Sequence, residues 1–158
     1  MVTIQDLGSL GELIAAVATV ITLAYLAVQI RQNTSTIRSA ALQTHNQNVQ
    51  QATAAISAST ESASVWQRGV TDFDGLSPAE QAQFMAIVLG VFNTCNAAHT
   101  NYLTGLLPAQ EWQREWGVLR FYLRSNGGQR AWETARRLNS LSSAFVEFAE
   151  AELLDRDT

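Results

Sequence analysis

LIAAVATVITLAYLAVQI, residues 13–30, is the stretch that decides the fold of this 158-residue chain. It contains no charged residue, and Gln29 is its only strongly polar one. As an α-helix it would rise about 27 Å at ~1.5 Å per residue, close to the ~30 Å thickness of a bilayer's hydrocarbon core. A helix on the surface of a soluble domain shows a polar face, and this stretch has none. We therefore predict a transmembrane helix within an anchor of residues 1–31.

The main alternative is a cleaved signal peptide. Such peptides begin with a positively charged segment. Here Asp6 and Glu12 precede the apolar run, and no basic residue occurs before Arg31. We therefore favour an uncleaved anchor. Arg31 and Arg38 follow the span, so the positive-inside bias predicts an outside N-terminus and a cytoplasmic C-terminal part.

Small residues in the anchor are spaced three and four apart and so share one helix face: Gly8, Gly11, Ala15, Ala18 and Thr22. Such residues permit close backbone approach between membrane helices. Alanine and threonine are also simply common in membrane spans. We favour a packing face that meets either a second copy of the chain or another membrane subunit.

Residues 32–64 are polar and lack proline and glycine. Their few large apolar residues include Leu42, Val49 and Ile56, which recur every seven positions. This pattern predicts a thin polar helical stalk that packs loosely on a partner, with a flexible linker as the alternative.

Residues 65–158 hold most of the aromatic residues and predict a small antiparallel helical bundle. Ser77, Pro78 and Glu80 form a strong helix start, and this helix is expected to run to about Leu103. The next helix contains Trp112 and Trp116 and stops at residues 125–128. Shorter helices follow it. The predicted fold class is all-α.

Composition excludes several functions. The net charge is −4 and all basic residues are arginine, which argues against nucleic acid as a main partner. The single cysteine, Cys95, cannot form an internal disulfide.

Cys95 and His99 are four residues apart on one helix face and are the strongest candidates for chemistry. Such a pair can form an activated thiolate or half of a metal site. Both belong to an apolar stripe, however, and the only other histidine, His45, lies in the predicted stalk. We favour core packing and keep Cys95 and His99 only as weak pocket candidates.

Glu111 and Glu115 are also four apart, and paired carboxylates can serve acid–base chemistry or hold metals. Di-iron bundles use a Glu-x-x-His spacing, which is absent here. We expect Glu111 and Glu115 to be surface residues paired with Arg114 or Arg120.

Six arginines lie between Glu111 and Leu138, and we favour a solvated face over contact with an anionic leaflet. They are Arg114, Arg120, Arg124, Arg130, Arg136 and Arg137.

The run Tyr25 to Thr34, YLAVQIRQNT, resembles the anchor-exit segment of a widespread group of uncharacterised bacterial membrane proteins. These have one N-terminal membrane helix and a helical cytoplasmic part. Weaker similarities are Arg68-Gly69, the helix after Leu76-Ser77, residues 105–107 followed by Trp112, and Trp132. The resemblance implies a location in the bacterial inner membrane but no activity, and no functional residue carries over.

The sequence thus contains no catalytic, cofactor or metal signature. The leading hypothesis is a non-enzymatic accessory or scaffold subunit of a bacterial inner-membrane assembly, with the lipid bilayer and other subunits or a second copy as partners. A membrane-anchored ligand-binding or sensory module is the alternative, and an enzyme is the least supported class.

Overall fold

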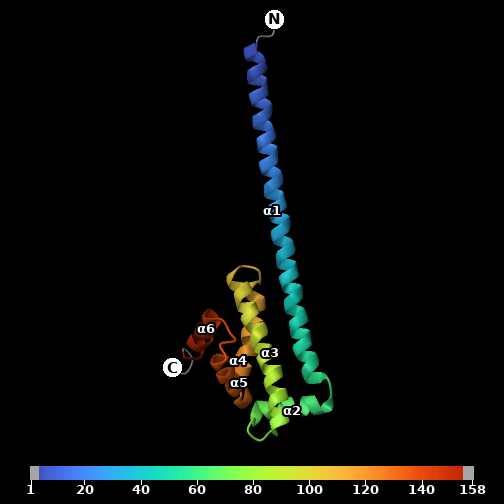
Figure 1. Cartoon of the computed structure of the whole chain (residues 1–158), viewed down its shortest axis with the longest axis vertical. Coiled ribbons are helices and arrows are strands. Elements are labelled where there is room, and N and C mark those ends of the chain that lie inside the picture. Colours follow the sequence, from blue (N-terminus) through green and yellow to red (C-terminus); the bar gives the residue numbers. More distant parts are fainter. Residues whose placement is uncertain (1–3, 155–158) are drawn as a thin grey trace. The chain divides into compact units, whose positions relative to one another are not determined.

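The computed structural model describes the backbone of residues 4–154 and the side chains of residues 11–152. Within that range the regular secondary structure is all α-helix, joined by short turns and without strands, so the predicted all-α class is confirmed (Figure 1). The helices are α1 (Ile4–Ser57), α2 (Thr60–Thr71), α3 (Pro78–Leu103), α4 (Ala109–Arg124), α5 (Asn126–Arg137) and α6 (Ser143–Leu154). The chain divides into two compact units, unit 1 (Met1–Ala40) and unit 2 (Ala41–Thr158).

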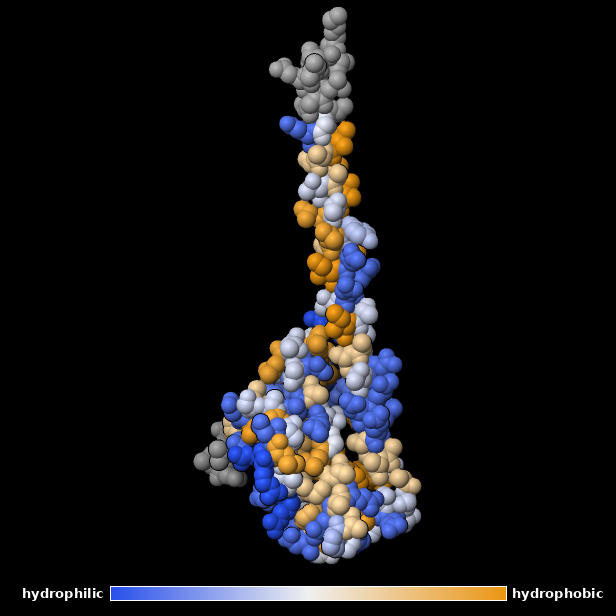
Figure 2. Space-filling view, viewed as in Figure 1, coloured by the Kyte–Doolittle hydropathy of each residue, from blue (hydrophilic) through white to orange (hydrophobic). Residues whose placement is uncertain are grey.

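Unit 1 presents its apolar side chains outward. Every residue from 11 to 40 is exposed, and Figure 2 shows apolar residues along this part of α1. Val20, Ile21 and Ile30 are 66, 63 and 66% exposed. One helix long and apolar enough to cross a membrane therefore lies near the N-terminus.

The two threonines of this apolar stretch satisfy their hydroxyls within the helix. Thr19 donates to the carbonyl oxygen of Ala15 and Thr22 to that of Ala18, each at 2.8 Å. A hydroxyl that donates to a backbone carbonyl of its own helix needs no hydrogen-bond partner outside the helix. This arrangement suits a helix in a medium that offers no hydrogen bonds.

Unit 2 begins at Ala41, whereas the sequence led us to expect boundaries at residues 31 and 64. α1 continues to Ser57, and α2 then starts at Thr60, capped by Ser59, whose side chain accepts a hydrogen bond from the Ser62 backbone N–H. Residues 41–57 of the expected stalk thus belong to the compact unit, and the chain turns seven residues before the expected boundary.

α3 is the central helix of unit 2, and α2, α4, α5 and α6 all pack against it. Phe84, Phe92 and Phe145 are fully buried. The Phe92 ring meets Trp132 edge to face, with 5.5 Å between ring centroids, and Tyr122 at 6.3 Å. Such edge-to-face pairs stabilise a core beyond the area they bury.

The start of α3 is the capping box expected from the sequence. The Ser77 hydroxyl accepts from the Glu80 N–H, and the Glu80 carboxylate accepts from the Ser77 N–H at 2.8 Å. Glu80 also pairs with Arg68 of α2. The hydrogen bonds from Arg68 and Ser77 lower the pKa of Glu80 to about 2.

Two glycines let α2 and α5 approach closely around Phe84. A methyl group placed on Gly69 would come within 2.2 Å of the Phe84 ring. One placed on Gly127 would lie 2.2 Å from the Gly69 carbonyl oxygen. Gly127 belongs to the first turn of α5, so the stop expected at residues 125–128 is a one-residue break at Ser125.

Candidate functional site

Residues 41–57 of α1 lie on the bundle of unit 2 through one buried side chain, that of His45, which is 7% exposed. Leu42 and Ala52 are partly buried against the core. The remaining residues of the segment are largely small or polar. The most buried side chain of this segment is therefore a polar one.

His45 pairs with a buried glutamate of α4. Its Nε2 atom lies 3.1 Å from Oε1 of Glu115, which is 8% exposed as a whole residue. The Cys95 thiol of α3 donates weakly to Oε2 of the same carboxylate at 3.8 Å. The Glu115 carboxylate thus connects three helices.

The expectation that Glu115 is a surface residue paired with arginine is wrong. Glu111 does pair with Arg114, at 2.8 Å, on the exposed face of α4. Glu115 lies one turn later and is covered by α1. Sequence spacing fixes only that both residues lie on nearby faces of α4, and the docking of residues 41–57 decides which one is buried.

Cys95 is fully buried and forms part of the core. Burial and the adjacent Glu115 carboxylate raise the pKa of the Cys95 thiol far above its ordinary value. A nucleophilic cysteine requires a thiolate, so this environment opposes nucleophilic chemistry.

His99 faces a different part of the core from Cys95. Its ring packs against Trp112 and Phe148, each at 5.0 Å between centroids, and Phe145 at 5.7 Å. Its Nδ1 atom is buried without a hydrogen-bond partner among the described residues, and burial lowers the pKa of His99. Aromatic rings therefore fill the space in which the sequence analysis placed a weak pocket candidate.

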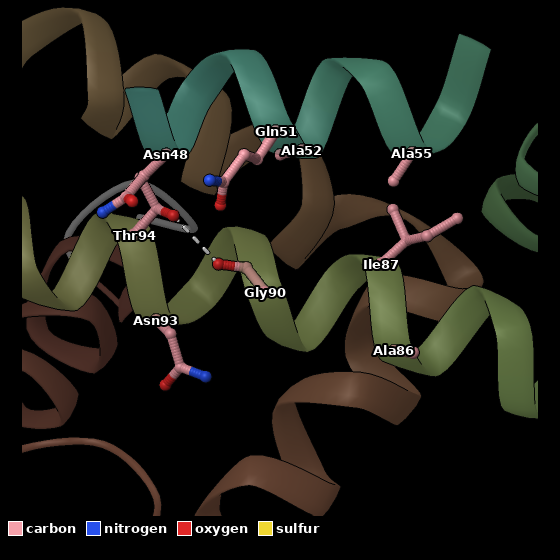
Figure 3. Close-up of a pocket in the computed structure, with 9 residues that line it drawn as sticks. All are labelled: Asn48, Gln51, Ala52, Ala55, Ala86, Ile87, Gly90, Asn93 and Thr94. Atoms are coloured by element: carbon pink, nitrogen blue, oxygen red, sulfur yellow. Dashed lines mark hydrogen bonds between the residues drawn. The ribbon is translucent and has the colours of Figure 1, made fainter. Parts of the chain in front are cut away.

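A groove of about 390 Å³ runs between residues 48–55 of α1 and residues 86–94 of α3 (Figure 3). The small residues Ala52, Ala55, Ala86 and Gly90 leave this space open. Asn48 and Gln51 project from α1 towards α3 (Figure 3). This groove was not predicted from the sequence, although Gly90, a residue without a side chain inside a long apolar helix, was a signal for it.

A smaller cavity of about 140 Å³ lies on the other side of Ala52. It is lined by Val49, Ala52, Thr53, Ile56, Val91, Thr94, Glu115, Val118 and Tyr122. Val49 and Ile56, expected to meet a partner, therefore line a cavity together with residues of α3 and α4 of their own chain, and Leu42 packs against the core of unit 2. The heptad spacing reflects an intramolecular contact.

The other predicted sites are placed as follows. Gly11, Ala15, Ala18 and Thr22 are exposed along α1, and the side-chain environment of Gly8 lies outside the described residues. Arg114, Arg130 and Arg136 form ion pairs with Glu111, Asp74 and Glu150. Among the described side chains, no three or more His, Cys, Asp or Glu residues are grouped to hold a metal ion.

Comparisons of the chain with protein-family models, curated proteins and solved structures found no match. The resemblance at residues 25–34 therefore stays an expectation.

Proposed function

We propose that this protein is a non-enzymatic accessory or scaffold subunit of a bacterial inner-membrane assembly, held in the bilayer by residues 13–30 of α1. One observation carries the proposal: the apolar residues of this span are exposed in all directions. Exposure of ten large apolar side chains to water would be strongly unfavourable, because burial of each is worth about 1.5–3 kcal/mol. Lipid removes that cost.

Lateral contacts are proposed for the small-residue face of the anchor. Gly11, Ala15 and Ala18 have little or no side chain, and the Thr22 hydroxyl is already bonded to the Ala18 carbonyl. A second helix can therefore approach this face closely. The partner is either another membrane subunit or a second copy of the chain.

Unit 2 is proposed to lie in the cytoplasm and to dock on that assembly. Arg31 and Arg38, after the span, support this orientation. The protonated Cys95 thiol and the ring-packed His99 favour a structural role over catalysis.

The test combines Gly11→Leu with Ala15→Leu. The larger side chains should separate the helices, so that fewer copies or subunits co-purify or cross-link after mild detergent extraction. Val17→Leu with Val20→Leu, on other faces of the same helix, is the matched control. Unchanged association in the first variant would contradict the packing face.

Full-length protein in the supernatant after high-speed centrifugation without detergent would contradict the membrane location.

A ligand-binding or sensory module is the second candidate, and the groove beside Ala52 favours it. Replacement of Ala52 by Leu would fill space on both sides of residues 48–56. A small molecule that co-purifies with the wild type and is lost from Ala52→Leu would support this function. Equal ligand content in both proteins would contradict it.

A further inference from the structure

Residues 41–57 of α1, called the strap below, are held more loosely than the other helices of unit 2. Close packing joins α2, α3, α4, α5 and α6 with one another, but not α1 with any of them. Within the strap, His45 is the one buried side chain, and Leu42 and Ala52 are partly buried. Open spaces of about 390 and 140 Å³ border Ala52. The strap therefore contacts the bundle of α2 to α6 at few points.

The core of this bundle is complete without the strap. The buried apolar residues of the described core lie between Val65 and Ala149. Those that the strap covers are at its edge: Val91 and Thr94 of α3 and Glu115 of α4 line the smaller cavity beside it. The bundle therefore keeps the contacts that hold it together when the strap leaves.

The most buried contact of the strap is a polar pair. The Nε2 atom of His45 lies 3.1 Å from Oε1 of Glu115. Once the strap is released, water can replace each partner, so a contact of this kind contributes little net free energy to docking. An apolar side chain of the same burial would lose its whole contribution on exposure to water. The strap is thus docked by a contact that can be exchanged for water.

The connection between the strap and α2 is a two-residue hinge, Ala58-Ser59. Ser59 is extended, with φ −156° and ψ 163°, and its hydroxyl accepts a hydrogen bond from the Ser62 N–H at 3.0 Å. No glycine or proline occurs from residue 12 to residue 68. Alanine and serine also fit inside a helix, so a change of φ and ψ at Ser59 can straighten the hinge.

We propose that the strap is a releasable tether. Docked through His45, it joins the bundle to unit 1 at residue 41; released, it joins them at the hinge. Release adds the 17 residues 41–57 to the connection, up to about 25 Å of helix at ~1.5 Å per residue. The proposal concerns contacts within unit 2 and does not depend on where residues 13–30 lie.

Distances between two spin labels, measured by pulsed electron–electron double resonance on the full chain in detergent micelles, test the proposal. One label is attached at Gln47→Cys in the strap and the other at Glu133→Cys on α5, where both side chains are exposed. The matched control is Gln113→Cys with Glu133→Cys, a pair that joins α4 to α5 and contains no strap residue. Cys95→Ala removes the native thiol from every sample.

We expect one main distance between positions 47 and 133 for the docked strap, and a second, broader one for the released strap. His45→Ala should raise the ratio of released to docked strap about tenfold, because docking then buries the Glu115 carboxylate without its partner. Asn46→Ala, at an exposed neighbouring residue, should leave the ratio unchanged. The distance between positions 113 and 133 should stay single throughout.

A single, identical 47–133 distance with and without His45→Ala would overturn the proposal. Equal ratios in His45→Ala and Asn46→Ala would also overturn it, since release would then not depend on His45. Broadening of the 113–133 distance together with loss of native tryptophan emission would show that the bundle itself unfolds, and that result would exclude a tether released from a folded bundle.

Discussion

Residues 13–30 of α1 and residues 81–103 of α3 are both long helical stretches without Asp, Glu, Lys or Arg, yet their environments are opposite. In α3, Phe84, Val88 and Phe92 are fully buried. In α1, Val20 and Ile21 are more than half exposed. The difference lies in the polar residues of α3: Asn93, Thr100 and Asn101 form an outward face, whereas residues 13–30 have no such face. A uniformly apolar helix requires an apolar surrounding on all sides.

The largest expected effect comes from charge placed in each stretch. Val20→Arg with Ile21→Arg should release the protein from membranes, because two central arginines cost about 5–7 kcal/mol of insertion free energy. Val88→Arg should instead unfold unit 2 without membrane release. Resistance to alkaline carbonate extraction measures the first effect. Tryptophan emission measures the second, since Trp66, Trp112, Trp116 and Trp132 all lie in unit 2.

The two readouts should separate cleanly. Val20→Arg with Ile21→Arg should keep the native tryptophan emission, and Val88→Arg should remain in the membrane fraction. Carbonate resistance of the double variant would contradict the contrast between the two stretches.

A smaller effect is expected where residues 41–57 meet the bundle. Glu115→Ala should lower the free energy of unfolding by about 1–3 kcal/mol, because it leaves the buried Nε2 atom of His45 without its hydrogen-bond partner. Glu111→Ala, which breaks the exposed pair with Arg114, should cost under about 1 kcal/mol. Denaturant titration in mild detergent, followed by tryptophan fluorescence, provides the measurement. Equal losses would show that His45 contributes no net stabilisation to Glu115.

Glycine substitutions sharpen the picture of unit 2 as a closely packed region. Gly127→Ala should destabilise it by about 1–3 kcal/mol through overpacking, because the added methyl meets the Gly69 carbonyl and Phe84. Gly117→Ala meets nothing within 4 Å and should stabilise α4 by up to about 1 kcal/mol. The same denaturant titration compares them. A neutral Gly127→Ala would mean that α2 and α5 can separate without loss.

The smallest effect concerns the pH dependence of the buried His99. Burial lowers its folded pKa below the ordinary 6.5, so the unfolded chain binds the proton first. Stability should fall as pH drops below about 6.5, by at most about 1.4 kcal/mol per pH unit. His99→Phe should lack this contribution, since uncharged Trp112, Phe145 and Phe148 surround the ring. Parallel pH curves for both proteins would contradict the prediction.

The sequence predicted the fold class and several elements correctly. The capping residues Ser77 and Glu80 act within four positions of each other, so the start of α3 follows from local chemistry. The end near Leu103 follows from the turn at Gly105. The domain boundary did not follow, because residues 41–57 bury a single side chain, and that side chain is histidine. A segment with such a pattern is indistinguishable from a solvated helix.

The sequence by itself determined that the chain is helical, that residues 13–30 can cross a bilayer and that the cysteine has no internal disulfide partner. These properties depend on neighbours along the chain and on composition. Only the tertiary structure decided that Glu115 is buried while Glu111 is partly exposed, that His45 belongs to the bundle, and that Cys95 and His99 face different surroundings. Each of these depends on which helix covers which face, and that arrangement is set by contacts between residues up to 70 positions apart.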